Sequence, residues 1–272
     1  MSIKLIALDL DGTLTNDQKI VTEHTKEILL KAGEAGVSIA LASGRPMLGV
    51  APIAESIGLD KVNSFVMAYN GGQIINYRSG EVVNYVNFHP DYIPEAVSCA
   101  REYGMPILTY SNTDIYTEGP LDEWAHREEI NCGKDAIVVD DLTKSIDFPI
   151  VKMMIAADPE KLKIPEKEMA ERFEGRLDIY RAEKWFLELM PKGINKFAGV
   201  KMIADYLGLA PDEVMACGDA NNDIPMLEYA GLGVAVANAS EQVKAIANFI
   251  SRSNNEDGVA YAVEKYVLHT IE

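Results

Sequence analysis

A short apolar segment near the start of the chain ends in two carboxylates that are one residue apart. Residues 5–8 are Leu-Ile-Ala-Leu, and Asp9, Leu10, Asp11, Gly12 and Thr13 follow directly. The apolar run is typical of a buried strand. Ligands of open α/β sheets bind beyond the carboxyl ends of the strands, so this turn constrains both the fold and the place of a site. If the chain turns after Asp9, both carboxylates can converge on one point.

The residue types in this turn suit an anion and a cation together. Gly12 lets the backbone pass close to an anion, and Thr13 offers a hydroxyl group. A divalent cation can bridge carboxylates and a phosphate. The turn therefore favours a site in which one aspartate attacks phosphorus and the other transfers a proton. Taken alone, the same stretch also fits a buried strand that runs into an acidic turn without any site.

Cysteine usage and hydropathy favour a cytoplasmic globular protein. No apolar run reaches the ~18 residues that a membrane span needs, and the acidic start does not resemble a signal peptide. Cys99, Cys132 and Cys217 are far apart in sequence and odd in number, which predicts reduced thiols. The four histidines show no metal-ligand spacing. A chain of 272 residues has room for one large core, or for two domains of roughly 100–200 residues each.

The formal net charge of −17 argues against two classes of partner. Nucleic acids and anionic membranes both need a basic footprint, so we expect neither as a partner. An enzyme that acts on anionic phosphates must then build a locally positive pocket on a negative body. A metal ion, a lysine and backbone N–H groups can supply it.

Strands and helices alternate in the two outer parts of the chain, which predicts an α/β fold with a parallel sheet. Expected strands are residues 5–9, 37–42, 64–68, 214–217, 233–236 and 249–250, with a hairpin at 73–77 and 81–86. Expected helices are residues 22–35, 47–57, 196–207, 224–230, 240–247 and 258–268.

The middle of the chain has a different pattern, with shorter elements and more proline. Expected strands are residues 105–110, 115–118, 136–139, 150–156, 177–180 and 185–190. Expected helices are one that ends at Tyr103 and two at 122–130 and 159–173. We therefore predict a discontinuous core domain, residues 1–84 and 191–272, and an inserted α+β domain, residues 85–190.

Three strand ends and one helix start carry polar groups that phosphoryl transfer requires. Besides the first turn, these groups are Ser43 and Gly44, Lys196 at a helix start, and Asp219, Asn222 and Asp223. Each one alone is more often an ordinary turn or a solvated charge. Their order and placement together predict a phosphoryl-transfer site.

These residues, in this order, resemble the haloacid dehalogenase superfamily of phosphatases. A narrower resemblance to the Cof-type branch and its YidA-like sugar-phosphate phosphatases comes from residues 41–46, 69–71, 195–196 and 254–260. The similarity spans essentially the whole chain. It implies a Rossmann-like core with a parallel sheet, an inserted α/β cap, and Mg²⁺-dependent hydrolysis of small phosphomonoesters, above all sugar phosphates.

The resemblance also implies roles for the site residues. Asp9 attacks phosphorus and becomes an aspartyl-phosphate, while Asp11 protonates the leaving alkoxide and then takes a proton from water. The phosphoryl oxygens contact the Leu10 amide, Thr13, Ser43, Gly44, Lys196 and Asn222. Mg²⁺ is bound by Asp9, the Asp11 carbonyl and Asp219, with Asp223 as a support or a further ligand.

Two other functions fit the same residues. A phosphomutase would use the same two aspartates to return the phosphoryl group to a sugar. A catalytically silent module would only bind a phosphorylated metabolite. The expected partner in each case is a small phosphorylated metabolite, and the chain is expected to be a monomer or a homodimer.

Overall fold

The computed structural model describes residues 2–271, whose contacts divide the chain into two compact units. Unit 1 comprises the chain up to Ser43, Val50–Asn84 and the part from Asn195 onward. Unit 2 comprises Gly44–Gly49 and Tyr85–Ile194. Each unit contains its own β-sheet and its own cluster of buried apolar side chains.

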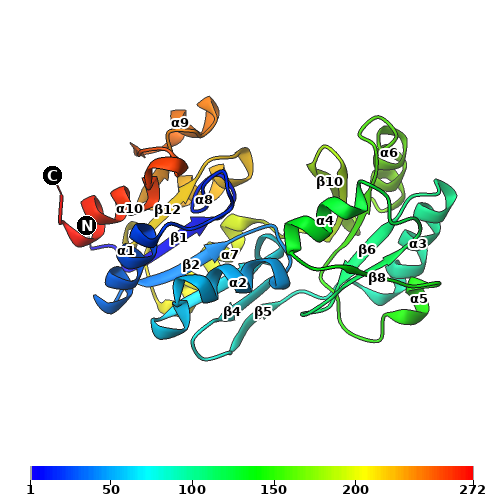
Figure 1. Cartoon of the computed structure of the whole chain (residues 1–272), viewed down its shortest axis with the longest axis horizontal. Helices are drawn as coiled ribbons and strands as arrows, with labels where there is room; N and C mark the ends of the chain where they lie inside the picture. The colour runs from blue at the N-terminus through cyan, green and yellow to red at the C-terminus, as the bar shows by residue number, and fades with distance from the viewer. Residues whose placement is uncertain (1, 272) are drawn as a thin grey trace. The chain divides into compact units, whose positions relative to one another are not determined.

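Among residues 2–271, unit 1 is built on an eight-stranded sheet in the order β14-β13-β12-β1-β2-β3-β4-β5 (Figure 1). The strands are β1 (Leu5–Asp9), β2 (Ser38–Ala42), β3 (Ser64–Ala68), β4 (Gln73–Asn76), β5 (Val82–Tyr85), β12 (Val214–Gly218), β13 (Leu232–Ala235) and β14 (Phe249–Ile250). The pairs from β14 to β3 are parallel, and β4 runs antiparallel to β3. This confirms the predicted parallel sheet.

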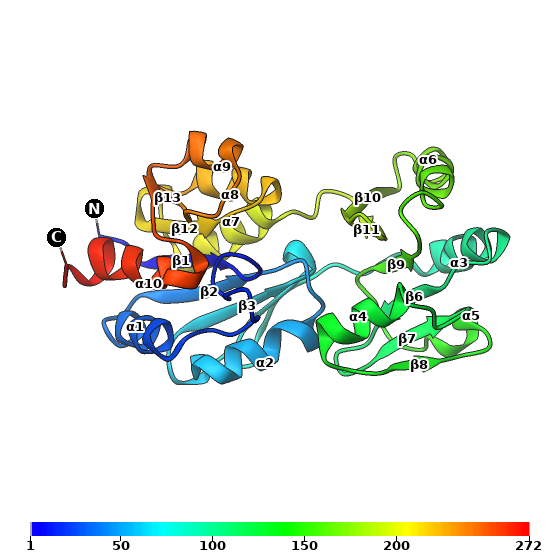
Figure 2. The same ribbon diagram turned by 45° about the horizontal axis from the view of Figure 1, so that its top comes forward.

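Helices cover both faces of this sheet, because alternate strand residues point to opposite sides. One face carries α7 (Lys196–Leu207), α8 (Ile224–Tyr229) and α9 (Glu241–Ile246), and the other carries α1 (Glu23–Glu34), α2 (Met47–Ile57) and α10 (Gly258–Val263) (Figure 2). A π-helical turn, Glu264–Leu268, continues α10. Phe65 and Met67 of β3 and Ile203 of α7 are fully buried in one apolar cluster of unit 1. Burial of each such side chain contributes about 1.5–3 kcal/mol to the free energy of unfolding.

The start of α7 is fixed by the residue that precedes it. The Asn195 side-chain oxygen accepts a hydrogen bond from the backbone N–H of Ala198 at 2.9 Å. This N-cap satisfies a donor that the first turn would otherwise leave unpaired. Gly208, in the left-handed conformation, ends the helix. Lys196 is therefore the first helical residue of α7.

Unit 2 contains a mixed sheet in the order β10-β11-β9-β6-β7-β8. The strands are β6 (Ile107–Tyr110), β7 (Ile115–Glu118), β8 (Ala136–Val138), β9 (Met153–Ala156), β10 (Leu177–Glu183) and β11 (Phe186–Pro191). Its helices are α3 (Ile93–Glu102), α4 (Ala125–Cys132), α5 (Leu142–Ser145) and α6 (Lys163–Arg172). β7 and β8 pair in parallel, whereas the β10-β11-β9-β6-β7 part is antiparallel.

Two helices of unit 2 begin later than predicted, because a turn around an aspartate precedes each of them. The Asp122 carboxylate accepts the backbone N–H groups of Trp124 and Ala125, so α4 begins at Ala125 instead of 122. Asp158 accepts the N–H of Glu160 in the same way, and α6 begins at Lys163 instead of 159. β9 begins three residues after the expected position, and α5 had no clear signal in the sequence.

Short 3₁₀ turns connect the elements at Leu59–Lys61, Tyr69–Gly71, Pro90–Tyr92, Pro211–Glu213, Asn221–Asp223 and Asn254–Glu256. Within residues 2–271, no helix has both the length and the apolar composition to cross a membrane. Cys99, Cys132 and Cys217 are free and buried, in agreement with the predicted reduced thiols. Burial raises the pKa of the Cys217 thiol and so keeps it in the unreactive form.

Candidate active site

The carboxyl ends of β1, β2 and β12 lie side by side in unit 1. Asp9 is the last residue of β1 and pairs with Ala42 at the end of β2. On the other side, Leu8 pairs with Cys217, one residue before the end of β12. Continued by one residue, this register places Asp9 beside Gly218, the last residue of β12, and Asp219 follows directly. The strand order thus brings together residues about two hundred positions apart, at the edge where α/β sheets bind ligands.

Lys196 lies between two of the aspartates. Its Nζ donates hydrogen bonds to Oδ1 of Asp9 at 2.5 Å and to Oδ1 of Asp223 at 2.6 Å. Lys196, Asp9 and Asp223 are 3%, 6% and 0% exposed, so water screens these charges little. The N-cap at the start of α7 points this lysine to the strand ends.

Asp223 also shapes the loop that follows β12. Its Oδ2 accepts the backbone N–H groups of Asp219 and Ala220, each at 3.0 Å. A Cβ at Gly218 would lie 2.5 Å from the Asp223 Cβ, so only glycine allows the loop to fold this tightly. Because both oxygens of Asp223 already accept hydrogen bonds, this carboxylate is placed to support the loop.

Asp219 is oriented by the turn after β1. Thr13 is 1% exposed, and its hydroxyl donates a hydrogen bond to Oδ1 of Asp219 at 2.9 Å. Gly12 has a φ of +82°, and a Cβ there would lie 2.7 Å from Oδ2 of Asp219. The glycine is thus required by the close approach of this carboxylate. Thr13, predicted to contact the phosphoryl group, is bonded to Asp219 in this structure.

The three carboxylates carry more negative charge than Lys196 can offset. Each of Asp9, Asp219 and Asp223 offers an oxygen, and these atoms lie within 4.8 Å of one another. Burial raises the pKa of Asp9 well above its usual range, and the charges of Asp223 and Asp219 raise it further against the opposing effect of Lys196. Burial also raises the pKa of Asp219. Burial opposes the charged form of Lys196, but the nearby carboxylates outweigh it and raise the pKa of this lysine.

A divalent cation fits this group of residues. Its charge would offset the surplus of negative charge that one lysine leaves among three aspartates. The donors are all carboxylate oxygens, and Mg²⁺ prefers oxygen ligands. The residues predicted as metal ligands from this cluster, Asp9, Asp219 and Asp223, are therefore chemically suited to Mg²⁺.

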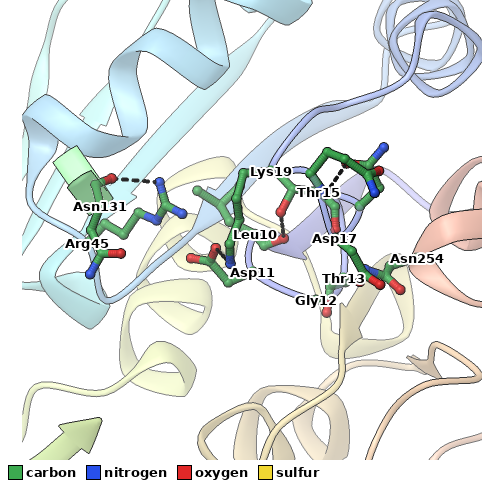
Figure 3. Close-up of polar contacts among 12 residues, drawn as sticks. Leu10, Asp11, Gly12, Thr13, Thr15, Asp17, Lys19, Arg45, Asn131 and Asn254 are labelled. Atoms are coloured by element: carbon green, nitrogen blue, oxygen red, sulfur yellow. Dashed lines mark hydrogen bonds and ion pairs between the residues drawn. The ribbon is translucent and has the colours of Figure 1, made fainter. Parts of the chain in front are cut away.

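The Asp11 side chain is not one of the three clustered carboxylates among the described residues. Its Oδ1 accepts a hydrogen bond from Nζ of Lys19 at 2.6 Å, and both side chains are partly exposed (Figure 3). The convergence of the Asp9 and Asp11 carboxylates on one point therefore stays a prediction. Lys19 had no signal in the sequence. Its φ of 60° is unusual for a residue with a side chain.

The predicted phosphoryl contacts lie around the same strand ends. Ser43 is 2% exposed, and its carbonyl accepts the backbone N–H of Asn70 at 2.8 Å. Within unit 2, the Gly44 carbonyl accepts a hydrogen bond from Nζ of Lys152 at 3.5 Å. Leu10 is fully buried, and Asn222 is exposed on the short turn after β12.

Two asparagines that the sequence did not single out as site residues also contact the loop after β1. Asn238 Nδ2 donates to the carbonyl of Gly12 at 2.7 Å, and Asn254 Nδ2 donates to the carbonyl of Thr15 at 3.1 Å. Asn254 belongs to the 254–260 stretch that contributes to the resemblance, whereas nothing in the sequence marks Asn238.

Comparisons with known proteins show which family the chain belongs to. The sequence model of the family described as haloacid dehalogenase-like hydrolase matches residues 6–263. YxeH of Bacillus subtilis (strain 168), which carries a provisional phosphatase name, is 33% identical over 272 residues and covers 97% of this chain and 98% of its own. YcsE of the same organism is named as a 5-amino-6-(5-phospho-D-ribitylamino)uracil phosphatase. It is 30% identical over 268 residues, which are 98% of this chain and 97% of YcsE.

A solved structure supports the same assignment. The crystal structure of a haloacid dehalogenase-like hydrolase from Bacteroides thetaiotaomicron matches with a TM-score of 0.94 and 38% identity over 97% of this chain and 99% of that one. The chain therefore belongs to the haloacid dehalogenase-like hydrolases, as a Cof-type phosphatase of that superfamily.

Proposed function

We propose that this protein is a Mg²⁺-dependent phosphatase that hydrolyses small phosphomonoesters, sugar phosphates among them, through an aspartyl-phosphate intermediate. The observation that carries the proposal is the buried Asp9, held by Lys196 beside Asp219 and Asp223. A carboxylate fixed at a strand end, with a cationic neighbour, is a nucleophile placed for a phosphoryl group.

In the first step, an oxygen of Asp9 attacks phosphorus, and the bond from phosphorus to the ester oxygen breaks. Asp11 gives its proton to the leaving alkoxide. In the second step, water attacks the aspartyl-phosphate while Asp11 takes a proton from that water. Inorganic phosphate leaves, and Asp9 is regenerated.

The remaining residues of the site would bind Mg²⁺ or the phosphoryl oxygens. Asp9, the Asp11 carbonyl and Asp219 would hold Mg²⁺, with Asp223 as their support; when bound, the ion supplies positive charge beside the transferring phosphoryl group. Lys196 has three donor hydrogens, two of which bond to Asp9 and Asp223, so a third can reach a phosphoryl oxygen. The Leu10 amide, Ser43, Gly44 and Asn222 are the other proposed contacts. In this scheme Thr13 acts through Asp219.

The proposed substrate is small and polyhydroxylated. YcsE is named for a phosphorylated ribitylamino compound, which is an ester of this kind. The net charge of −17 opposes binding of nucleic acid or of an anionic membrane. We also propose a cytoplasmic location and a monomeric or homodimeric state.

Phosphate release from a panel of phosphomonoesters tests the proposal. We expect release from sugar phosphates with Mg²⁺, a fall of about 100-fold or more with EDTA, and recovery when Mg²⁺ is added back. Formation of an isomeric hexose phosphate in place of inorganic phosphate would assign a mutase. Binding of a sugar phosphate without any metal-dependent turnover would assign a silent binding module.

Substitution of Gly12 with alanine should lower the rate of this reaction and weaken the binding of Mg²⁺. The new Cβ would lie 2.7 Å from Oδ2 of Asp219 at a φ of +82°, so Asp219 and the turn must move apart. A displacement of about 1 Å can cost about 100-fold in rate, and the Mg²⁺ concentration for half-maximal activity should rise. The control is Gly80→Ala, which has a φ of +75° and nothing within 4 Å of the added Cβ. Equal Mg²⁺ curves for the two variants would contradict this role of Gly12.

A further inference from the structure

The loop that carries Asp11 is closed on itself. The backbone N–H and the hydroxyl of Thr15 both donate to the carbonyl of Leu10, each at 2.9 Å. Lys19, at the other end of the loop, adopts a left-handed conformation and reaches Asp11 with its side chain (Figure 3). The Lys19 side chain therefore links the position of the Asp11 carboxylate to the conformation of residues 10–19.

Two asparagine side chains hold this loop from outside. Asn238 Nδ2 donates to the Gly12 carbonyl at 2.7 Å, and Asn254 Nδ2 donates to the Thr15 carbonyl at 3.1 Å. The Asn238 side-chain oxygen accepts the backbone N–H of Asn254 at 2.9 Å, so the two asparagines form one connected pair. The carbonyls that they bind lie on either side of Thr13, the residue that orients Asp219.

The backbone around Asn254 is held firmly. Asp257 has a φ of 56°, and its carboxylate accepts the hydroxyl groups of Thr22 and Thr25 at the start of α1. A Cβ at Gly258 would lie 2.1 Å from the carbonyl oxygen of Arg252, so the turn at 252–258 packs tightly. Asn254 itself is 5% exposed. Its amide is thus presented to the loop from a fixed position.

The same amide group also binds a carboxylate of the loop. Asn254 Nδ2 lies 3.2 Å from Oδ1 of Asp17 (Figure 3). Asn255 exchanges two hydrogen bonds with Asp17, at 3.0 and 3.1 Å. The hydrogen bonds from Asn255 and Asn254 lower the pKa of Asp17. An amide donor suits both the Thr15 carbonyl and this carboxylate, whereas a second carboxylate at position 254 would repel Asp17.

We propose that Asn254 is a positioning residue for the reaction: by fixing the Thr15 carbonyl and Asp17, it sets where loop 10–19 holds Asp11. This role rests on the proposed function, in which Asp11 protonates the leaving group. Substrates whose leaving groups need a proton should therefore depend on Asn254. A substrate that leaves readily as an anion should depend on it little, because Asp9 stays in place on β1.

The test compares Asn254→Asp with wild type, because aspartate keeps the shape, removes the donor and places a second carboxylate beside Asp17. With glycerol phosphate, a poor leaving group, kcat/KM should fall about 10- to 100-fold, a fraction of what a general acid supplies. With 4-nitrophenyl phosphate, a good leaving group, kcat/KM should stay within about threefold of wild type. The control, Asn76→Asp, also removes a donor from a buried asparagine, whose Nδ2 bonds to Asn63 in the same unit. In this control, kcat/KM should remain near the wild-type value with both substrates.

Equal losses with the two substrates would indicate only fewer folded molecules and would overturn the proposal. Hydrogen exchange of peptides covering residues 10–20 gives a second readout that does not depend on activity. Exchange there should speed up in Asn254→Asp and not in Asn76→Asp, and unchanged exchange would also overturn the proposal. If wild type releases no phosphate from either ester, the proposed function fails, while the exchange data still decide whether Asn254 fixes the loop.

Discussion

Replacing Asp9 with asparagine is expected to abolish phosphate release while leaving the fold of unit 1 intact. The amide keeps an oxygen that can accept the hydrogen bond from Lys196, but it cannot act as the nucleophile. Loss of a nucleophile that acts together with other catalytic residues typically lowers kcat by about 10⁴-fold or more. Steady-state phosphate release with saturating Mg²⁺ measures this change.

The same substitution should preserve or raise the stability of the metal-free protein. The pKa of Asp9 is raised in the folded state, chiefly by burial. A carboxyl whose folded pKa lies above its unfolded value favours folding most when protonated, and its contribution is lost as the pH rises through the folded pKa. Above that pKa, asparagine removes the cost of burying the charge. In EDTA at neutral pH, the Tm of Asp9→Asn should therefore equal or exceed that of wild type, with a smaller difference in acid.

A matched control distinguishes these effects from those of any aspartate-to-asparagine change. Asp205 is exposed on α7, where it pairs with Lys201 at 2.6 Å. Asp205→Asn should leave both the activity and the Tm close to wild type. Residual activity of Asp9→Asn within about tenfold of wild type would contradict the covalent mechanism. A large loss of Tm would show instead that Asp9 is needed for folding.

The parts of the fold that could be predicted are those encoded by neighbouring residues. The predicted bounds of α2 and β3 agree with the structure, because each is a largely apolar segment bordered by turns. The start of α7 follows from Asn195 as its N-cap. The aspartates at the strand ends could also be recognised, because each directly follows an apolar segment. A parallel sheet brings such strand ends to one edge.

The side-chain directions within the site could not be predicted, because they depend on contacts between distant residues. Thr13 was expected at the phosphoryl group, yet its hydroxyl bonds to Asp219, which lies 206 positions away. Asn238 reaches the Gly12 carbonyl across 226 positions. Asparagine occurs in so many turns that no local pattern separates this one from the rest. The pairing of β7 with β8 in unit 2 is parallel for similarly nonlocal reasons.

Replacing Lys196 with methionine should have the largest effect on stability, together with a severe loss of activity. Methionine keeps a long apolar side chain but leaves Asp9 and Asp223 buried without the cation between them. Removing one partner of a buried ion pair costs about 3–5 kcal/mol, because the remaining charge stays desolvated. In EDTA we expect the Tm to fall by about 10 °C, a shift that thermal unfolding followed by circular dichroism measures.

Added Mg²⁺ should restore part of this lost stability, since its charge offsets the same carboxylates, while kcat stays low because no lysine contacts the phosphoryl oxygens. The control is Lys201→Met on the same helix, where an exposed pair with Asp205 contributes at most about 1 kcal/mol. If Lys196→Met were as stable in EDTA as Lys201→Met, the aspartates would not need a cation. If Mg²⁺ stabilised wild type but not Lys196→Met, the lysine would itself be required for metal binding, and the surplus of negative charge would not be what attracts the ion.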